Sequence, residues 1–171
     1  MTPASSGAGH HPVQARFELL DHEGRWVSEQ SFRGDFMLVF FGFTRCKMVC
    51  PRALTRLSTA LDILGPHAAR IHPLYITVDP EHDSPNVMKA FLQQRFPRFT
   101  GLTGPATAID EAKRSFHVFS RKQADPEDPS GYRVPHSAFT YLIGTDGQYV
   151  AHFSDAVDAR DLAVRLTSLL A

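Results

Sequence analysis

The chain has 171 residues, with 18 lysines and arginines balanced by 18 aspartates and glutamates. Its hydrophobic fraction of 43% allows a sizeable core, and its length fits one domain. A formal net charge of zero argues against a nucleic-acid-binding protein, which normally carries a basic excess. The longest apolar run, residues 36–43, is far too short to span a membrane, and the opening residues lack the apolar segment of a signal peptide.

The first part of the chain predicts a leader, a hairpin and a buried strand. Residues 1–15 are small and polar and are predicted to be a flexible leader, followed by a single domain over 16–171. Residues 17–20 and 25–27 flank a glycine-containing turn, which is typical of a β-hairpin. Residues 37–41 are apolar on both faces, as in a central strand that is covered on both sides.

The middle of the chain predicts helices that alternate with a second strand. A helix is expected over 51–64, with proline at its first position, where no amide donor is needed. Residues 74–78 predict a buried strand, and 84–95 a helix that starts with a serine cap followed by proline. A further helix is expected over 107–116. The polar segment 120–133 is predicted to be a long loop.

The last part of the chain predicts an antiparallel strand pair and a helix. Residues 139–143 and 148–153 flank the turn sequence GTDG, which is a strong hairpin signal. Leucines recur after residue 161 at helical spacing. Strands that alternate with helices and finish in an antiparallel pair predict an α/β domain with a mixed central sheet and helices on both faces.

Both cysteines lie in the stretch GFTRCKMVCP, at Cys46 and Cys50, between a predicted strand and a predicted helix. They could form a disulfide, a redox dithiol or a metal site, or be two small core residues. Sites in open α/β sheets gather at this end of the strands, which favours chemistry over packing. Pro51 disfavours helical backbone at Cys50, so we expect neither cysteine on a regular helix. The positive helix end, together with Arg45 and Lys47, favours thiolate.

The spacing of the cysteines leans toward metal. Common redox pairs read C-x-x-C, whereas this pair is C-x-x-x-C. Two thiolates and one further ligand suit copper, while structural zinc usually takes four protein ligands. The nine histidines are individually weak candidates for that ligand. His136 stands out because it opens the strand 139–143, which approaches the cysteines if the two strands are neighbours. Six of the other histidines are assigned from their positions to the leader, to solvated turns or to an edge strand: His10, His11, His22, His67, His72 and His152.

Several segments, in the same order along the chain, resemble the Sco/SenC copper chaperones of cytochrome oxidase assembly. That family has a thioredoxin-like fold, so the resemblance implies this fold here, with the N-terminal hairpin described above. FFGFTRCKMVCP is similar to the cysteine motif of that family, and YITVDPEHDSP to its strand-end segment. FTGLTG resembles a connector, and VPHSAFTYLIGTDGQYVAHF the histidine motif and hairpin. The resemblance runs from about Phe17 to Leu170, which is most of the chain.

The resemblance implies a copper site, for Cu(I) or Cu(II), formed by Cys46, Cys50 and His136. It also implies an acidic position near the site at Asp79, which is otherwise interpreted as a turn cap before a proline. The expected partners are a copper-receiving oxidase subunit, another periplasmic copper carrier or a thiol reductant. The family is normally tethered at the exported face of a membrane, most often facing the bacterial periplasm. We expect no tether within this sequence.

Two other functions use the same residues. One is a thiol-disulfide oxidoreductase that reduces the cysteines of the oxidase copper site, with Cys46 and Cys50 as its catalytic pair. The other is a redox or copper sensor. The chain also departs from the resemblance at Lys47 and Val49, where the family often carries Pro and Asp, and at Pro135, where an acidic residue is common. These changes make the expected site more positive.

Overall fold

The computed structural model describes residues 13–45, 49–118, 123–125, 128–133 and 139–171. The strands are β1 (Glu18–Asp21), β2 (Trp26–Ser28), β3 (Phe36–Gly42), β4 (Ile71–Thr77), β5 (Thr100–Thr103), β6 (Gln123–Asp125), β7 (Asp128–Arg133), β8 (Phe139–Ile143) and β9 (Tyr149–Ser154). The helices are α1 (Val49–Leu64), α2 (Pro85–Arg95), α3 (Ala106–Ser115) and α4 (Ala159–Leu170).

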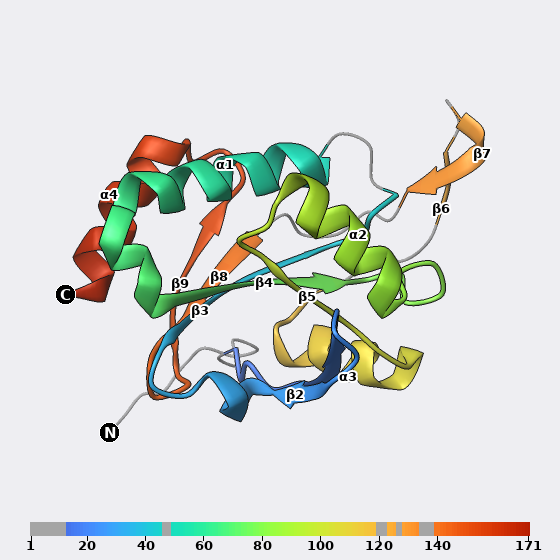
Figure 1. Ribbon diagram of the computed structural model, residues 1–171, viewed down its shortest axis with the longest axis horizontal. Helices are drawn as coiled ribbons and strands as arrows, with labels where there is room; N and C mark the ends of the chain where they lie inside the picture. The colour runs from blue at the N-terminus through green and yellow to red at the C-terminus, as the bar shows by residue number, and fades with distance from the viewer. Residues whose placement is uncertain (1–12, 46–48, 119–122, 126–127, 134–138) are drawn as a thin grey trace, which may run out of the picture.

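Seven strands form one mixed sheet in the order β2-β1-β5-β4-β3-β8-β9. The central strands β5, β4 and β3 run parallel, so their carboxyl ends meet at one edge. Strand β8 pairs with β3 antiparallel and therefore begins at that same edge. The sheet thus brings the start of β8 beside the end of β3, although the two lie far apart in the sequence (Figure 1).

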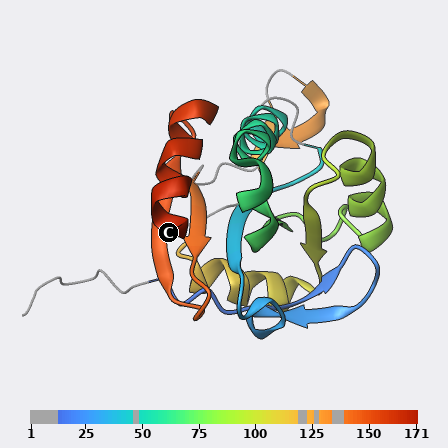
Figure 2. The ribbon, with the colours of Figure 1, turned by 60° about the vertical axis from the view of Figure 1, so that its left-hand side comes forward.

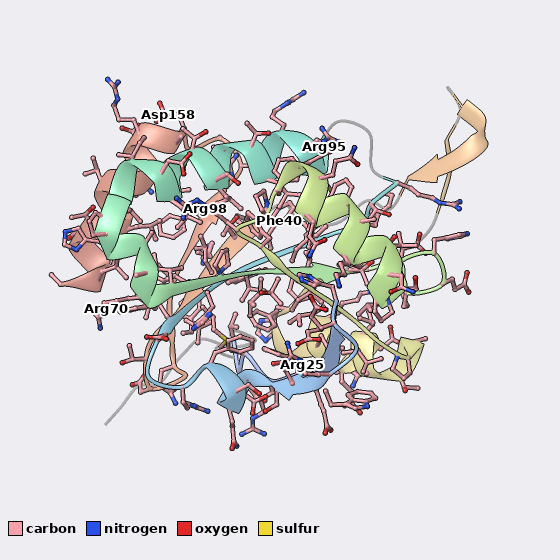
Figure 3. The ribbon with its side chains drawn as sticks, viewed as in Figure 1. Arg25, Phe40, Arg70, Arg95, Arg98 and Asp158 are labelled. Atoms are coloured by element: carbon pink, nitrogen blue, oxygen red, sulfur yellow. The ribbon has the colours of Figure 1, made fainter. Side chains whose placement is uncertain are left out.

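Strand β3 separates two hydrophobic cores because its side chains alternate between the faces of the sheet. Phe36, Leu38 and Phe40 point toward the core beneath α1, α2 and α4. The other core, which includes α3, receives the intervening side chains of the strand, Met37, Val39 and Phe41. Figure 2 shows α3 on one side of the sheet and α1 and α4 side by side on the other. Phe40 lies between the sheet and its helices, stacked with Tyr75 at 6.1 Å between ring centroids (Figure 3).

The helix starts follow local sequence rules. Ser84 caps α2, accepting a hydrogen bond at 3.3 Å from the amide of Val87, and Pro85 occupies the first turn. Asp158 caps α4 in the same way, with the amide of Asp161 at 2.8 Å. These caps satisfy amides that have no partner inside the helix, and α2 starts at the serine cap that the sequence predicts.

Three predictions about elements need correction. Helix α1 begins at Val49, so Cys50 lies on a helix, contrary to the expectation drawn from Pro51. Proline is tolerated there because amides of the first helical turn have no intrahelical acceptor. Residues 100–103 form β5 rather than a connector. The segment predicted as a long loop contains β6 and β7, which pair as a separate two-stranded sheet near the start of α1 (Figure 1).

The arrangement is the mixed α/β, thioredoxin-like fold with an N-terminal hairpin that the sequence predicts. Within the described ranges, no helix is long and apolar enough to cross a membrane. Residues 1–12 of the predicted leader lie outside the described part of the chain, whereas Ala15, its last residue, is fully buried.

Candidate metal centre

The candidate site lies at the sheet edge where β3 and β4 end and β8 begins. The amide of Val78 donates to the carbonyl of Gly42 at 2.8 Å, which continues the parallel pairing just beyond β4. On the other side of β3, Phe40 pairs with Thr140, one residue into β8. The chain segments that carry the predicted ligands therefore leave the sheet, or enter it, at neighbouring points.

Cys50 is fully buried in the first turn of α1, directly over the end of β3. A β-carbon placed on Gly42 would lie 2.8 Å from Cys50 Sγ and 2.7 Å from Cε1 of Tyr75. Contacts this short mean that any side chain at that position would force the thiol or the tyrosine ring to move. Glycine at the end of the strand thus leaves the space in which the thiol and the tyrosine ring pack. The thiol lies at the positive end of α1, which stabilises a thiolate.

Asp83 is a fully buried carboxylate that joins the loop after β3 to the end of β4. Its Oδ2 accepts from the amide of Thr44 at 3.0 Å and from Oγ1 of Thr77 at 2.7 Å. Its Oδ1 accepts from Oγ1 of Thr44 at 2.5 Å. The backbone carbonyl of Asp83 accepts a fourth hydrogen bond from the hydroxyl of Thr103 at 2.6 Å.

Asp79 lies in the turn after β4 and is also buried. Its carboxylate is 3.0 Å from Nδ1 of His82, and its amide donates to Oγ1 of Thr77 at 2.9 Å. Potential ligand atoms of Asp79, Glu81 and His82 all lie within 4.8 Å of one another. The turn therefore gathers two carboxylates and an imidazole next to the edge where β3 ends.

A shallow groove of about 580 Å³ adjoins the start of α1. It is lined by the first turns of α1, including Pro51 and Arg52, and by the residues that lead into α4. Arg56 crosses it and donates from Nη1 to the carbonyl of Asp155. Partial burial lowers the pKa of the Arg56 guanidinium, and the nearby Asp155 opposes that shift. The surface beside the candidate site thus carries both basic and acidic groups.

The structure places some of the predicted site residues and not others. It describes Cys50 and Asp79 and brings both to the same edge of the sheet. Arg45 is exposed beside them. Four other residues singled out in the sequence lie outside the described part of the chain: Cys46, Lys47, Pro135 and His136.

Two histidines that the sequence assigns to solvated turns are engaged in the fold. Nδ1 of His22 accepts from the amide of Gly101 at 3.0 Å, and the side chain is only 14% exposed. His72 is half-buried and lies 3.0 Å from Asp35. His22 lies in a turn that folds back onto β5, and His72 lies on β4 itself, which local sequence patterns do not reveal. His67 is exposed, as predicted, and His152 lies exposed on the edge strand β9.

Sequence reasoning missed Asp83 and its threonine partners. In the sequence, Asp83 precedes the capping Ser84 and looks like one more polar turn residue. A carboxylate that is buried needs several donors, and those come from Thr44 and Thr77 in other segments. The only local signal is a threonine at each strand end, and this becomes informative once the strands are known to be neighbours.

Comparison with known proteins gives a consistent assignment. The family model described as SCO1/SenC matches residues 5–171. An SCO2-like protein of Rickettsia felis is 40% identical over 138 residues, which cover 80% of this chain and 67% of that protein.

Solved structures agree in fold. The copper-bound structure of ScoI from Bradyrhizobium japonicum is 33% identical, with a TM-score of 0.81, and covers 91% of this chain and 98% of its own. Copper-bound yeast Sco1 is 30% identical, with a TM-score of 0.82, and covers 92% of this chain and 88% of its own.

Proposed function

The chain belongs to the SCO1/SenC family, and from this premise we propose that it is a copper chaperone that delivers copper to a subunit of a respiratory oxidase. In this function Cys46, Cys50 and His136 bind the copper that is passed on. Two of the solved structures that resemble the chain, ScoI of Bradyrhizobium japonicum and yeast Sco1, contain copper. Copper is the cargo of the protein, held as Cu(I) or Cu(II) and then released.

The position of Cys50 is the observation that carries this function. The thiol is buried over Gly42 at the start of α1, where the helix dipole favours its ionised form. Thiolates are soft ligands that select Cu(I), and an imidazole added to two thiolates also accommodates Cu(II). A buried thiolate at the edge of the sheet is chemically suited to hold one side of a copper ion.

The sheet order supports His136 as the third ligand. The histidine lies three positions before Phe139, the first residue of β8, and β8 is the antiparallel neighbour of β3. The sequence analysis makes His136 a ligand candidate if its strand lies beside the first buried strand. That arrangement of β8 and β3 is present. Cys46 lies four positions after Gly42 in the sequence, and β3 ends at the edge of the sheet where β8 begins.

Asp79 influences the charge of the site in this function. It lies buried at the end of β4 and contacts His82, close to the edge where the cysteine segment begins. A carboxylate near a metal stabilises the more highly charged ion. Because Lys47, Val49 and Pro135 stand where the family often has Pro and acidic residues, Asp79 has a larger share of the negative charge in this chain.

A thiol-disulfide oxidoreductase is the second candidate, and the burial of Cys50 favours a specific form of it. A buried thiol cannot approach a partner protein directly, so Cys46 would attack the target and Cys50 would resolve the mixed disulfide. The two functions share both cysteines. They differ at His136, which copper binding requires and dithiol exchange does not.

The cellular setting follows from the family. The protein acts at the exported face of a membrane, most simply in the bacterial periplasm, as one domain over residues 16–171, to which the buried Ala15 also belongs. Its partners are the oxidase subunit that receives copper, a periplasmic copper carrier and a thiol reductant. No nucleic acid takes part, in keeping with the zero formal net charge.

Titration of the reduced protein with Cu(I) against a chelator tests this function. We expect one copper per chain, with strong loss of affinity in Cys46→Ala, Cys50→Ala and His136→Ala. His152→Ala is the matched control, because His152 is exposed on β9 and is expected to leave the affinity unchanged. Equal binding by the wild type and all three ligand variants would refute the site. Full disulfide exchange with a defined target by His136→Ala would separate the redox function from copper binding.

A further inference from the structure

We propose that Asp83 is a positioning residue that fixes the backbone leading into Cys46 and thereby sets the copper affinity of the site. This inference rests on the proposed function and adds to it a residue outside the proposed set of copper ligands. Asp83 acts through Thr44, which lies two residues before Cys46.

The carboxylate of Asp83 is bound in a way that defines the backbone of the cysteine segment. It accepts from both the amide, at 3.0 Å, and the hydroxyl, at 2.5 Å, of Thr44. Two hydrogen bonds to one residue fix the orientation of its peptide plane as well as its side chain. The end of β3 is held at Gly42 by the amide of Val78 at 2.8 Å. The two restraints together fix the chain up to Thr44, just before the exposed Arg45.

The other end of this hydrogen-bond network is anchored in the sheet. Thr77, the last residue of β4, donates to Oδ2 of Asp83 at 2.7 Å. Thr103, the last residue of β5, donates to its carbonyl at 2.6 Å. Asp83 therefore connects the ends of two neighbouring parallel strands to the loop that follows the third. All three side chains other than Thr44 are fully or almost fully buried, so solvent does not weaken the network.

A buried carboxylate with this set of donors is more than a core residue. Burying such a group is unfavourable unless hydrogen bonds compensate it, and an apolar side chain would fill the same space without that requirement. The donors at Thr44 lie in the segment that follows β3 and leads to Cys46, one of the proposed copper ligands. Ligands held in place before the metal arrives bind it more tightly, because less conformational freedom is lost on binding.

The test uses variants that separate positioning from packing. Asp83→Ala removes the whole network, and Thr44→Val removes only the hydroxyl on the cysteine loop. Asp83→Asn is the conservative variant. Its oxygen at the Oδ2 position keeps the bonds from Thr44 and Thr77, while its amide nitrogen donates to the Thr44 hydroxyl, which accepts as readily as it donates. Thr103→Val is the matched control, because it removes a buried hydrogen bond to the same residue without touching the cysteine loop.

Each reduced variant is measured for Cu(I) affinity by chelator competition and for thermal unfolding without copper. We expect Asp83→Ala and Thr44→Val to lose about tenfold in Cu(I) affinity, as is usual when residues that orient metal ligands are removed. Asp83→Asn is expected to restore affinity to within about threefold of the wild type, which is near the limit of a difference in hydrogen-bond quality. Thr103→Val is expected to lower the unfolding temperature but to keep the affinity.

The positioning role of Asp83 is refuted if Cu(I) affinity falls only in proportion to the unfolding temperature. In that case Thr103→Val would lose as much Cu(I) affinity as Thr44→Val. A second measurement, the rate of Cys46 alkylation at pH 7, does not involve copper. A wild type that fails to bind Cu(I) would overturn the proposed function. In that case, a threefold or larger change in alkylation rate in Asp83→Ala but not in Thr103→Val would still support positioning, and unchanged rates would overturn it.

Discussion

The sulfur of Cys50 packs over the α-carbon of Gly42, so closely that a β-carbon at Gly42 would lie 2.8 Å from it. The glycine is the last residue of β3, and the cysteine lies in the first turn of the following helix. The loop that carries Cys46 therefore has both ends fixed in contact with each other. A residue without a side chain is what allows the helix to start this close to the sheet.

Gly42→Ala is expected to destabilise the protein and to weaken Cu(I) binding together. The new methyl group overlaps Cys50 Sγ and the Tyr75 ring, and overpacking of this kind costs about 1–3 kcal/mol of unfolding free energy. Displacement of Sγ should also lower Cu(I) affinity. Urea unfolding of the apo protein and chelator competition measure the two effects.

Gly101→Ala provides the control for that substitution. Its β-carbon would also be crowded, at 2.9 Å from Cδ1 of Leu92, but on β5 and against α2 rather than α1. We expect a similar or smaller loss of stability with unchanged Cu(I) affinity. Equal copper binding by both glycine variants would show that the Gly42 contact does not set the position of the thiol.

Asp79→Asn is expected to weaken Cu(II) binding more than Cu(I) binding. The substitution keeps the shape of this buried side chain but removes a negative charge near the proposed site, and the divalent ion loses more electrostatic stabilisation than the monovalent one. Separate competition titrations with each ion measure the difference. Asp155→Asn, on the groove beside α1, is the comparison. Unchanged affinity for both ions would place Asp79 too far from the metal to matter, and equal losses would contradict an effect of its charge.

Leu57→Ala is expected to lower the unfolding free energy by about 2–5 kcal/mol, because a buried leucine is replaced by a cavity. Leu57 lies on the inner face of α1 and is fully buried in the core that also contains Cys50. Asp62→Ala, on the exposed side of the same helix, removes an ion pair to Arg98 at 2.7 Å and is expected to cost no more than about 1 kcal/mol. Chemical denaturation measures both, and comparable costs would contradict the packing of α1 described above.

Tyr141→Phe is expected to make the protein less sensitive to alkaline pH. Burial, with a smaller contribution from Tyr149, raises the pKa of Tyr141 from 10.0 to about 12. The folded state therefore retains the phenol proton at a pH where the unfolded chain has released it. This contribution to stability is fully present below pH 10 and is lost as the pH rises toward 12. Urea midpoints at pH 9, 10 and 11 should fall more steeply for the wild type, and parallel declines would contradict the shift.

Elements with strong local signals were predictable. The serine cap and proline of α2 give its start at Pro85, and the observed helix ends at Arg95 as expected. The apolar run of β3 and the GTDG turn between β8 and β9 also lead to the observed elements. These signals depend on residues within one turn or one strand, where propensity and burial agree.

Elements that depend on distant partners were not predictable to the same degree. β5 is short and contains Gly101, which is poor strand material, and it forms because β4 and β1 lie on either side of it. β4 begins at Ile71 rather than at Leu74, because Pro73 lies where β5 does not reach and no amide is required on that side. β6 and β7 are polar and pair with each other, so they lack the alternation that marks a strand on a core.

The candidate site shows the same division. The reactive character of the cysteine segment follows from local sequence, and the neighbouring position of β8 follows from the fold alone. The hydrogen bonds of Asp83 join three segments, so only the assembled sheet reveals them. The ligand roles of Cys46, Cys50 and His136 stay predictions.

The apolar character of β3 on both faces leaves its alignment weakly specified by hydrophobicity. A slip of one residue would exchange the apolar side chains of residues 37–41 between the two cores. The same slip would bring Phe41 or Phe43 to the place of Gly42, beneath Cys50, where even a β-carbon would crowd the thiol and the Tyr75 ring. The glycine therefore acts as an alignment mark for the central strand. A chain in which β3 is shifted in register by one residue could not pack the start of α1, which carries Cys50, against the end of the strand.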